Sequence, residues 1–178
     1  VRGRLRVYLE RLLRAYNEPV CTPPRPSRMC PHAGLKDVPD GYCLACRLFG
    51  SPWREAAVFC SDFHVADGDD FGDELAEAWK GLMVLRTGVG IGRKLGTARE
   101  ERLFFTEAVP QVAGQGAVRF IGEIEARADR PEIGWLVAAM SLVTHLGGQK
   151  GRGLGRVSLA VRSVSRWDGG SEWVWLDA

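Results

Sequence analysis

The segment from residue 21 to residue 52 limits the possible folds of this chain more than any other. It reads CTPPRPSRMCPHAGLKDVPDGYCLACRLFGSP, with prolines, cysteines and turn residues in place of regular apolar spacing. Such a composition is too irregular for a strand or a long helix. Because ordering a chain costs conformational entropy, the segment needs another source of order.

Four cysteines can supply that order. Cys43 and Cys46 form a CxxC pair, and Cys21 and Cys30 precede them in the same segment. Four thiolates at such positions could close a tetrahedral zinc site, and His32 could replace one of them. With all four positions filled by protein, the zinc would have no open coordination site. We therefore predict a structural zinc and not a catalytic one.

Two other states of these cysteines stay open. A disulfide pair is disfavoured because nothing in the sequence signals export, and free thiols that merely share a loop are the second alternative. A redox CxxC is disfavoured, because thioredoxin-type chemistry needs the motif at the start of a long helix that follows a βαβ strand, and this motif does not open such a helix. Cys60 falls in an expected strand, where a buried thiol is the usual interpretation.

Length and composition favour one globular domain. The chain has 178 residues, of which 46% are hydrophobic and 26% charged. No apolar run approaches the roughly 20 residues that span a bilayer, and the opening, VRGRLRVYLERLLRAY, lacks the apolar core of a signal peptide. We expect a cytoplasmic protein without membrane contact.

The rest of the chain divides into regular elements by its apolar spacing and turn residues. In the first half of the chain we expect a helix over 3–16, the cysteine segment, a β-type run over 55–68 and an acidic helical or polar segment over 69–81. A glycine-rich excursion over 87–101 and strands over 102–109 and 117–128 should follow. The chain should then form a helix over 130–148, with Gly147 at its end, and a strand over 156–167. This order matches three quarters of a ferredoxin-like βαββαβ unit. The sequence predicts an α+β, ferredoxin-like (RRM-like) domain over 1–178, with its first strand upstream of Val1.

Two glycine-rich stretches carry positive charge. TGVGIGRKLG contains Arg93 and Lys94, and GGQKGRGLGR contains Lys150 and Arg152. Neither fits the nucleotide motifs GxGxxG or GxxxxGK[ST] in the required strand, turn and helix order. Exposed backbone N–H groups with these cations could still bind a polyanion, and glycine permits close approach. The alternative is that the glycines serve tight turns and packing while the charges keep the loops solvated.

The arginine-rich start of the chain shifts this balance. The net charge is only +2, but Arg2, Arg4, Arg6, Arg11 and Arg14 gather in the first helix. A polyanion responds to the distribution of charge more than to its total. Two cationic loops and this helix together favour nucleic-acid binding.

Several segments together resemble the RAMP superfamily of CRISPR-associated proteins. In chain order they read VRGRLRVYLERLL, CLACRLFGS, FCSDFHV, RTGVGIGRKLGTAREERLFFTEAVP, FIGEIEA and LVTHLGGQKGRGLGRVSLAV. They are most similar to backbone subunits of type III effector complexes of the Csm and Cmr kinds, or to a matching domain of a fused effector. The similarity runs from residue 1 to about residue 164.

This resemblance implies a set of RNA contacts. In the family the glycine-rich loop before the last strand lies against the crRNA backbone, while base pairing reads the sequence. The loop residues implied are Gly148, Lys150, Gly151, Arg152, Gly153 and Arg156. The segment VRGRLR matches the start of the family's first helix, which implies phosphate contacts by Arg2 and Arg6.

The family also has a thumb, a β-hairpin that interrupts guide–target pairing. The matching excursion covers residues 86–103, with its tip expected among 94–102, and the resemblance implies RNA-facing roles for Arg86, Arg93, Lys94 and Thr97. Gly92 departs from the family, since many relatives have an aspartate there.

Catalysis is assigned to no residue of this sequence. Related subunits cut target RNA with an aspartate in a loop ahead of the first-helix motif, and that loop has no counterpart here. Asp62, Asp67 or His64 could substitute as acid or base. Acids between a strand and a helix are more often caps or solvated surface.

Three functions follow from these observations. The first is a crRNA-binding backbone subunit or domain of a type III effector, with target RNA and other RAMP subunits as partners. The second is an endoribonuclease that cuts target RNA or processes guide precursor with an aspartate upstream of residue 1. The third is a zinc-stabilised protein-interaction module without RNA.

Overall fold

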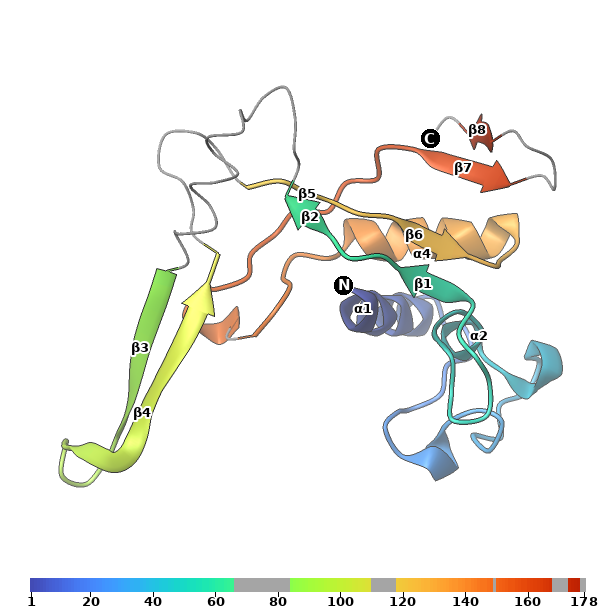
Figure 1. The fold of residues 1–178 in the computed structure, drawn as a ribbon. Helices are drawn as coiled ribbons and strands as arrows, with labels where there is room; N and C mark the ends of the chain where they lie inside the picture. The colour runs from blue at the N-terminus through green and yellow to red at the C-terminus, as the bar shows by residue number, and fades with distance from the viewer. Residues whose placement is uncertain (66–83, 110–117, 149, 168–172, 177–178) are drawn as a thin grey trace. The chain divides into compact units, whose positions relative to one another are not determined.

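The structure is a computed structural model, and it describes residues 1–65, 84–109, 118–148, 150–167 and 173–176. The chain divides into two compact units, one of Val1–Cys60 with Ile124–Ala178 and one of Ser61–Glu123. The first unit contains α1, α2 and α4, and the described part of the second is made of strands (Figure 1). The acidic segment expected over 69–81 lies outside the described residues.

Helix α1, Arg2–Ala15, forms the centre of the first unit. Leu5, Leu9 and Leu13 recur every four residues and are completely buried or nearly so. This spacing places them on one face of the helix, which confirms the helix expected over 3–16. The chain leaves the helix at Asn17, whose φ of 59° lies in the left-handed region that asparagine tolerates.

The cysteine segment contains little regular structure, as its composition predicts. Two short 3₁₀ turns, η1 at Pro26–Arg28 and η2 at Pro39–Gly41, precede α2 at Leu44–Phe49. Ala45, Leu48 and Phe49 of α2 are buried and join the same core as the leucines of α1. The insertion is thus ordered at its end by apolar packing.

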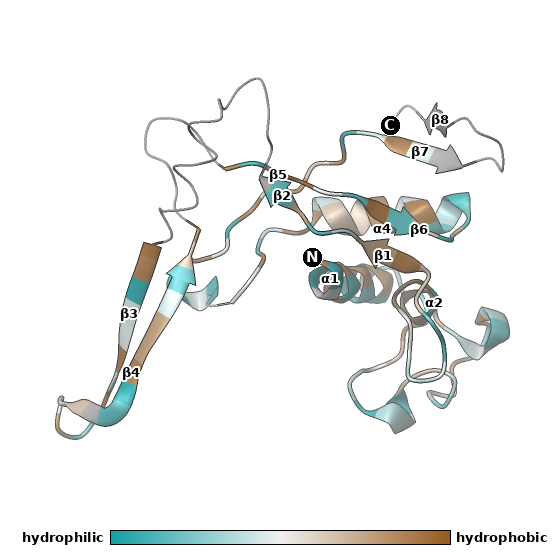
Figure 2. Cartoon of the chain, in the orientation of Figure 1, coloured by the Kyte–Doolittle hydropathy of each residue, from teal (hydrophilic) through white to brown (hydrophobic). Residues whose placement is uncertain are grey.

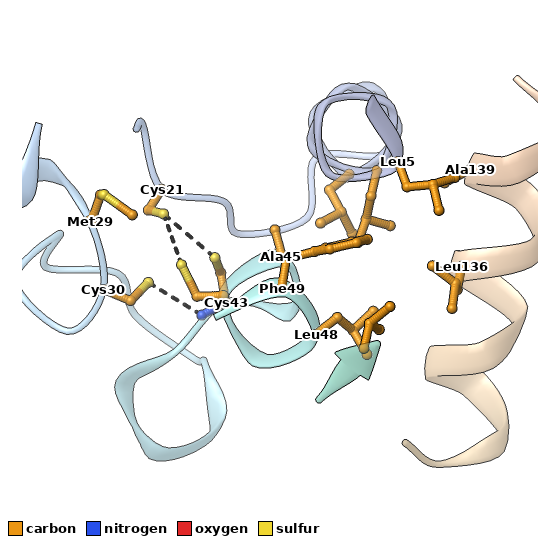
Figure 3. Close-up of a cluster of buried hydrophobic side chains, with 14 of the residues drawn as sticks. Leu5, Cys21, Met29, Cys30, Cys43, Ala45, Leu48, Phe49, Leu136 and Ala139 are labelled. Carbon is orange, nitrogen blue, oxygen red and sulfur yellow. Dashed lines mark hydrogen bonds between the residues drawn. The ribbon is translucent and has the colours of Figure 1, made fainter. Parts of the chain in front are cut away.

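Helix α4, Arg130–Ser141, covers the other side of this core. It begins with a capping box, in which the Asp129 carboxylate accepts from the Glu132 N–H and Glu132 accepts from the Asp129 N–H. Leu136 and Ala139 are buried, and Figure 3 shows them facing the core beside Leu5. Glu132 also forms an ion pair with Arg47, which ties α4 to α2.

The expected helix over 130–148 is too long. After Ser141 the backbone of residues 144–146 pairs with that of residues 155–157. Leu146 N–H donates to the Gly155 carbonyl at 2.8 Å, and Val157 N–H donates to the Thr144 carbonyl at 2.9 Å. These antiparallel bonds use the groups that a continuing helix would need. The helix therefore ends before Gly147.

Two small antiparallel sheets belong to the first unit. Strand β1, Val58–Cys60, pairs with β6, Ile124–Ala126, and β7, Val164–Trp167, pairs with β8, Trp173–Leu176. The strand expected over 156–167 forms a ladder only at its end. Residues 157–163 pair with no strand in the described part of the chain, although Val157 and Leu159 pack against the core.

The second unit contains a short sheet and a long hairpin. Strand β2, His64–Val65, pairs with β5, Phe120–Ile121, and β3, Val84–Ile91, pairs with β4, Ala98–Ala108. The excursion expected over 87–101 is therefore part of an antiparallel hairpin, whose register shifts between Val89 and Ile91. Glycines at 88 and 90 make room on β3 for the Phe104 ring and the Arg102 side chain. Figure 2 shows the middle of β4 as apolar and its start as hydrophilic.

The single strand expected over 117–128 is two strands in the structure. It breaks between β5 and β6 at Gly122 and Glu123, where the Phe63 ring lies so close to Gly122 that a Cβ there would meet it at 2.6 Å. The Ser61 hydroxyl accepts from the Glu123 N–H in this break. Ala117 lies outside the described residues.

Candidate functional site

Four buried cysteine side chains converge at one end of the core. Cys21 follows α1, Cys30 follows η1, and Cys43 and Cys46 lie at the start of α2, where one helical turn brings their side chains together. All four Sγ atoms lie within 4.8 Å of one another. The Sγ of Cys21 is 3.4 Å from that of Cys46 and 3.8 Å from that of Cys43 (Figure 3).

This arrangement fits a tetrahedral metal ion. A Zn–S bond of about 2.3 Å places the sulfur atoms of a tetrahedral site about 3.8 Å apart. The pairs at 3.4 and 3.8 Å lie near that spacing. Four thiolate ligands would fill a tetrahedral site and leave no coordination position for a substrate. His32 instead packs edge-on against the Trp53 ring, with centroids 4.4 Å apart. The four cysteines are thus close enough to bind a metal ion without His32.

The thiols differ in their tendency to ionise. The hydrogen bond with the Cys46 side chain lowers the pKa of Cys43 to about 4. Burial raises the pKa of Cys30 to about 11, and the hydrogen bond with Cys43 together with burial raises the pKa of Cys46. A metal ion needs thiolate ligands, so binding here would displace protons.

Arg2 and Arg6 lie against the cysteine insertion. Arg2 donates to the Phe49 carbonyl at 2.7 Å, and Arg6 donates to the Gly50 carbonyl at 2.8 Å. Arg6 also forms an ion pair with Glu10 at 2.9 Å. Burial lowers the pKa of Arg6. The Glu10 hydrogen bond and the nearby cysteines together raise it by more than burial lowers it, so the pKa lies above its usual value.

The glycine-rich loop is closed at its base, and its residues 147–148 and 150–153 are exposed. An isolated bridge joins His145 to Arg156, and the loop between them contains a 3₁₀ turn, η3, at Lys150–Arg152. The cationic residues Lys150, Arg152 and Arg156 are exposed. The predicted loop residues are therefore brought together on one surface segment.

The glycines of this loop differ in how strongly the fold requires them. Gly155 has a φ of +74°, and a Cβ there would collide with the Leu146 carbonyl at the base of the loop. At Gly148 and Gly151 a Cβ would meet nothing within 4 Å, and neither has a positive φ. The fold thus requires glycine at Gly155, and positive φ favours it at Gly147 and Gly153, whereas neither space nor φ requires it at Gly148 or Gly151.

The β3–β4 hairpin contains the other residues predicted to contact RNA. Arg93 and Lys94 are exposed in the turn, where Gly92 N–H donates to the Thr97 carbonyl at 2.8 Å. Arg86 is exposed on β3 opposite Thr106. Among the catalytic alternatives, Asp62 and His64 are exposed, and Asp67 lies outside the described residues.

The sequence profile of the RAMP superfamily matches residues 1–158. The chain belongs to the RAMP superfamily. This match includes the cysteine segment, the hairpin and the whole glycine-rich loop. A search of curated proteins found no match. RAMP proteins work in multi-subunit, CRISPR-associated complexes with RNA. None of the described helices of this RAMP chain is long and apolar enough to span a bilayer.

The sequence prediction missed a second polar row on the first helix of this RAMP chain. Arg4 donates to the Gly147 carbonyl at 3.3 Å, and the Tyr8 hydroxyl lies 3.1 Å from Thr144 Oγ1. The Arg11 guanidinium lies 5.6 Å from the centre of the Tyr8 ring. The Thr144 hydrogen bond lowers the pKa of Tyr8, and the charges of Arg11 and Lys150 add to that effect. The helical spacing of positions 4, 8 and 11 is the signal that could have revealed this row.

Proposed function

We propose that this RAMP chain is a crRNA-binding backbone subunit or domain of a type III CRISPR effector. In this role it holds guide RNA and spaces the guide–target duplex for antiviral defence. Its partners are crRNA, complementary target RNA and other RAMP subunits or domains, in the cytoplasm. Membership of the superfamily supports the RNA-bound complex, and the surfaces described above support the finer assignment.

The glycine-rich loop carries this proposal. Gly148 and Gly151 are glycines that the fold does not require, in a loop that also presents Lys150 and Arg152. A bare backbone gives an RNA strand close access to N–H groups, and the cations neutralise its phosphates. We assign RNA contacts in this loop to Gly148, Lys150, Gly151, Arg152, Gly153 and Arg156.

The hairpin is the second part of the RNA site. Its turn presents Arg93 and Lys94 to solvent, with Thr97 beside them and Arg86 further along β3. We assign it the role of the thumb over residues 86–103. The phosphate contacts of Arg2 and Arg6 stay a prediction, since both guanidinium groups already donate to the insertion.

The cysteine cluster is proposed as a structural zinc site. Its ligands would be Cys21, Cys30, Cys43 and Cys46, and their burial and sulfur spacing support this assignment. Bound zinc would hold the insertion 21–52 in place. We further propose that the whole chain forms one ferredoxin-like RAMP domain that carries this insertion and the hairpin.

The test is the identity of the nucleic acid that accompanies the protein. We expect the native protein to copurify with discrete short RNA that carries CRISPR repeat-derived ends, which sequencing of the extracted RNA would show. Binding of such RNA should weaken steeply with salt, since each neutralised phosphate contributes about 0.7 to the logarithmic slope on a single strand. Copurification of proteins alone, without RNA, would favour the interaction-module alternative instead.

A further inference from the structure

The polar residues of α1 form two rows with different partners. Arg2, Arg6 and Glu10 follow one another every four residues; Arg2 and Arg6 donate to the cysteine insertion, and Glu10 pairs with Arg6. Arg4 and Tyr8 form the other row, which faces residues 144–147. One helix therefore contacts both the cysteine cluster and the glycine-rich loop, by different side chains.

Arg6 makes the most contacts in the first row. Its Nη1 donates to the Gly50 carbonyl at 2.8 Å, its Nε donates to Glu10 at 2.9 Å, and its Nη2 donates to Cys46 Sγ at 3.6 Å. The planar guanidinium thus joins a carbonyl, a carboxylate and a sulfur atom. A lysine ammonium cannot offer donors in this fixed fork.

Glu10 explains why this contact is held in place. The residue is only 6% exposed and its carboxylate accepts from Arg6, with Arg14 further away at 3.8 Å. A buried carboxylate requires a nearby cation, so Glu10 fixes the Arg6 guanidinium beside the cluster. Arg14 adds a second link, since it donates to the Cys21 carbonyl at 3.2 Å.

The hydrogen bond from Arg6 to Cys46 would stabilise a bound metal ion. Four thiolates around a divalent ion leave two net negative charges in a buried site. A hydrogen bond from a cation to one thiolate stabilises that charge and orients the ligand, and such outer contacts strongly affect metal affinity. The thiolate accepts more strongly than the thiol, so metal binding should also tighten the hold on α1.

We propose that Arg6 is a positioning residue that couples the bound metal to α1 through its hydrogen bond to Cys46. The inference rests on the metal site proposed above and is independent of RNA binding. It assigns Arg6 two linked effects: higher metal affinity, and attachment of the first turns of α1 to the insertion.

The experiment compares three variants of the full chain with the wild type. Arg6→Ala removes all three donor contacts but leaves Glu10 buried beside a more distant arginine. The double variant Arg6→Met with Glu10→Met removes both charges, so that no buried carboxylate is left without a partner. Arg11→Ala removes the same charge from the other side of the helix and is the matched control.

Zinc affinity is measured by competition with a chelator, and the thiolate absorption bands of the Co²⁺ form report the ligand environment. We expect Arg6→Ala and the double variant to bind zinc about 10–100-fold more weakly, with shifted Co²⁺ bands, and Arg11→Ala to match the wild type. Wild-type affinity and bands in the double variant would overturn the proposal, because the loss in Arg6→Ala would then come from Glu10 alone. A wild type that binds neither ion would overturn the metal site itself.

Discussion

The cysteine insertion and the β3–β4 hairpin differ in the burial of their side chains. The insertion directs its thiols and apolar side chains inward, and Cys30 and Cys46 are completely buried. The hairpin exposes large apolar side chains, with Leu95 83%, Ile91 61% and Leu103 61% exposed. The insertion finds its partners within the chain, whereas the described part of the chain leaves these hairpin side chains exposed.

Because of this difference, substitutions can test folding and binding separately in this RAMP chain. Substitutions in the insertion should change stability and metal content, and those in the hairpin should change binding at constant stability.

Loss of one cluster ligand should have the largest effect. Cys43→Ser should abolish zinc binding and lower the free energy of unfolding by more than about 4 kcal/mol, since structural zinc contributes on the order of 10 kcal/mol. Metal analysis and thermal unfolding would measure both. Cys60→Ser is the control, because Cys60 lies outside the cluster. Full stability of a wild type that contains no metal would refute the zinc assignment.

Substitution of a core leucine should lower the free energy of unfolding more than substitution of a hairpin leucine. Leu9 is completely buried, and Leu9→Ala should lower the free energy of unfolding by about 2–5 kcal/mol through lost burial and a cavity. Leu95→Ala in the hairpin turn should change it by less than about 0.5 kcal/mol. Chemical denaturation gives both values. Equal losses would show that the hairpin turn is covered within the chain.

The same contrast exists inside the glycine-rich loop. Gly155→Ala should cost about 1–3 kcal/mol, because alanine is strained at positive φ and its Cβ would meet the Leu146 carbonyl. Gly148→Ala should leave the unfolding free energy unchanged while weakening RNA binding. Denaturation and RNA titration on the same samples distinguish the two. Normal RNA affinity in Gly148→Ala would show that the RNA backbone does not approach that position.

The hairpin cations should affect binding alone. The double change of Arg93 and Lys94 to alanine should weaken RNA binding alike for all sequences and reduce the salt slope by up to about 1.4, or 0.7 for each phosphate contact. The melting temperature should not change. Arg28 and Lys36, exposed in the insertion, give a double alanine variant with the same loss of charge. If both double variants behave alike, the hairpin has no specific role.

Local sequence predicted the elements that depend on near neighbours. The spacing of Leu5, Leu9 and Leu13 fixes α1, and the irregular composition of residues 21–52 predicts a segment without long helices or strands. The four cysteines identified from the sequence are the four that converge. The RAMP resemblance found from short segments is confirmed at the level of the superfamily.

Contacts between distant residues decided the rest. The end of α4 depends on backbone bonds from residues 144 and 146 to residues 157 and 155, which no helix pattern reveals. The choice between solvent and insertion for Arg2 and Arg6 depends on carbonyl groups more than forty positions away. Sequence by itself thus determined which residues carry charge, sulfur and apolar surface. Which charges are used inside the fold follows from packing, because the carbonyl groups that Arg2 and Arg6 bind lie far away along the chain.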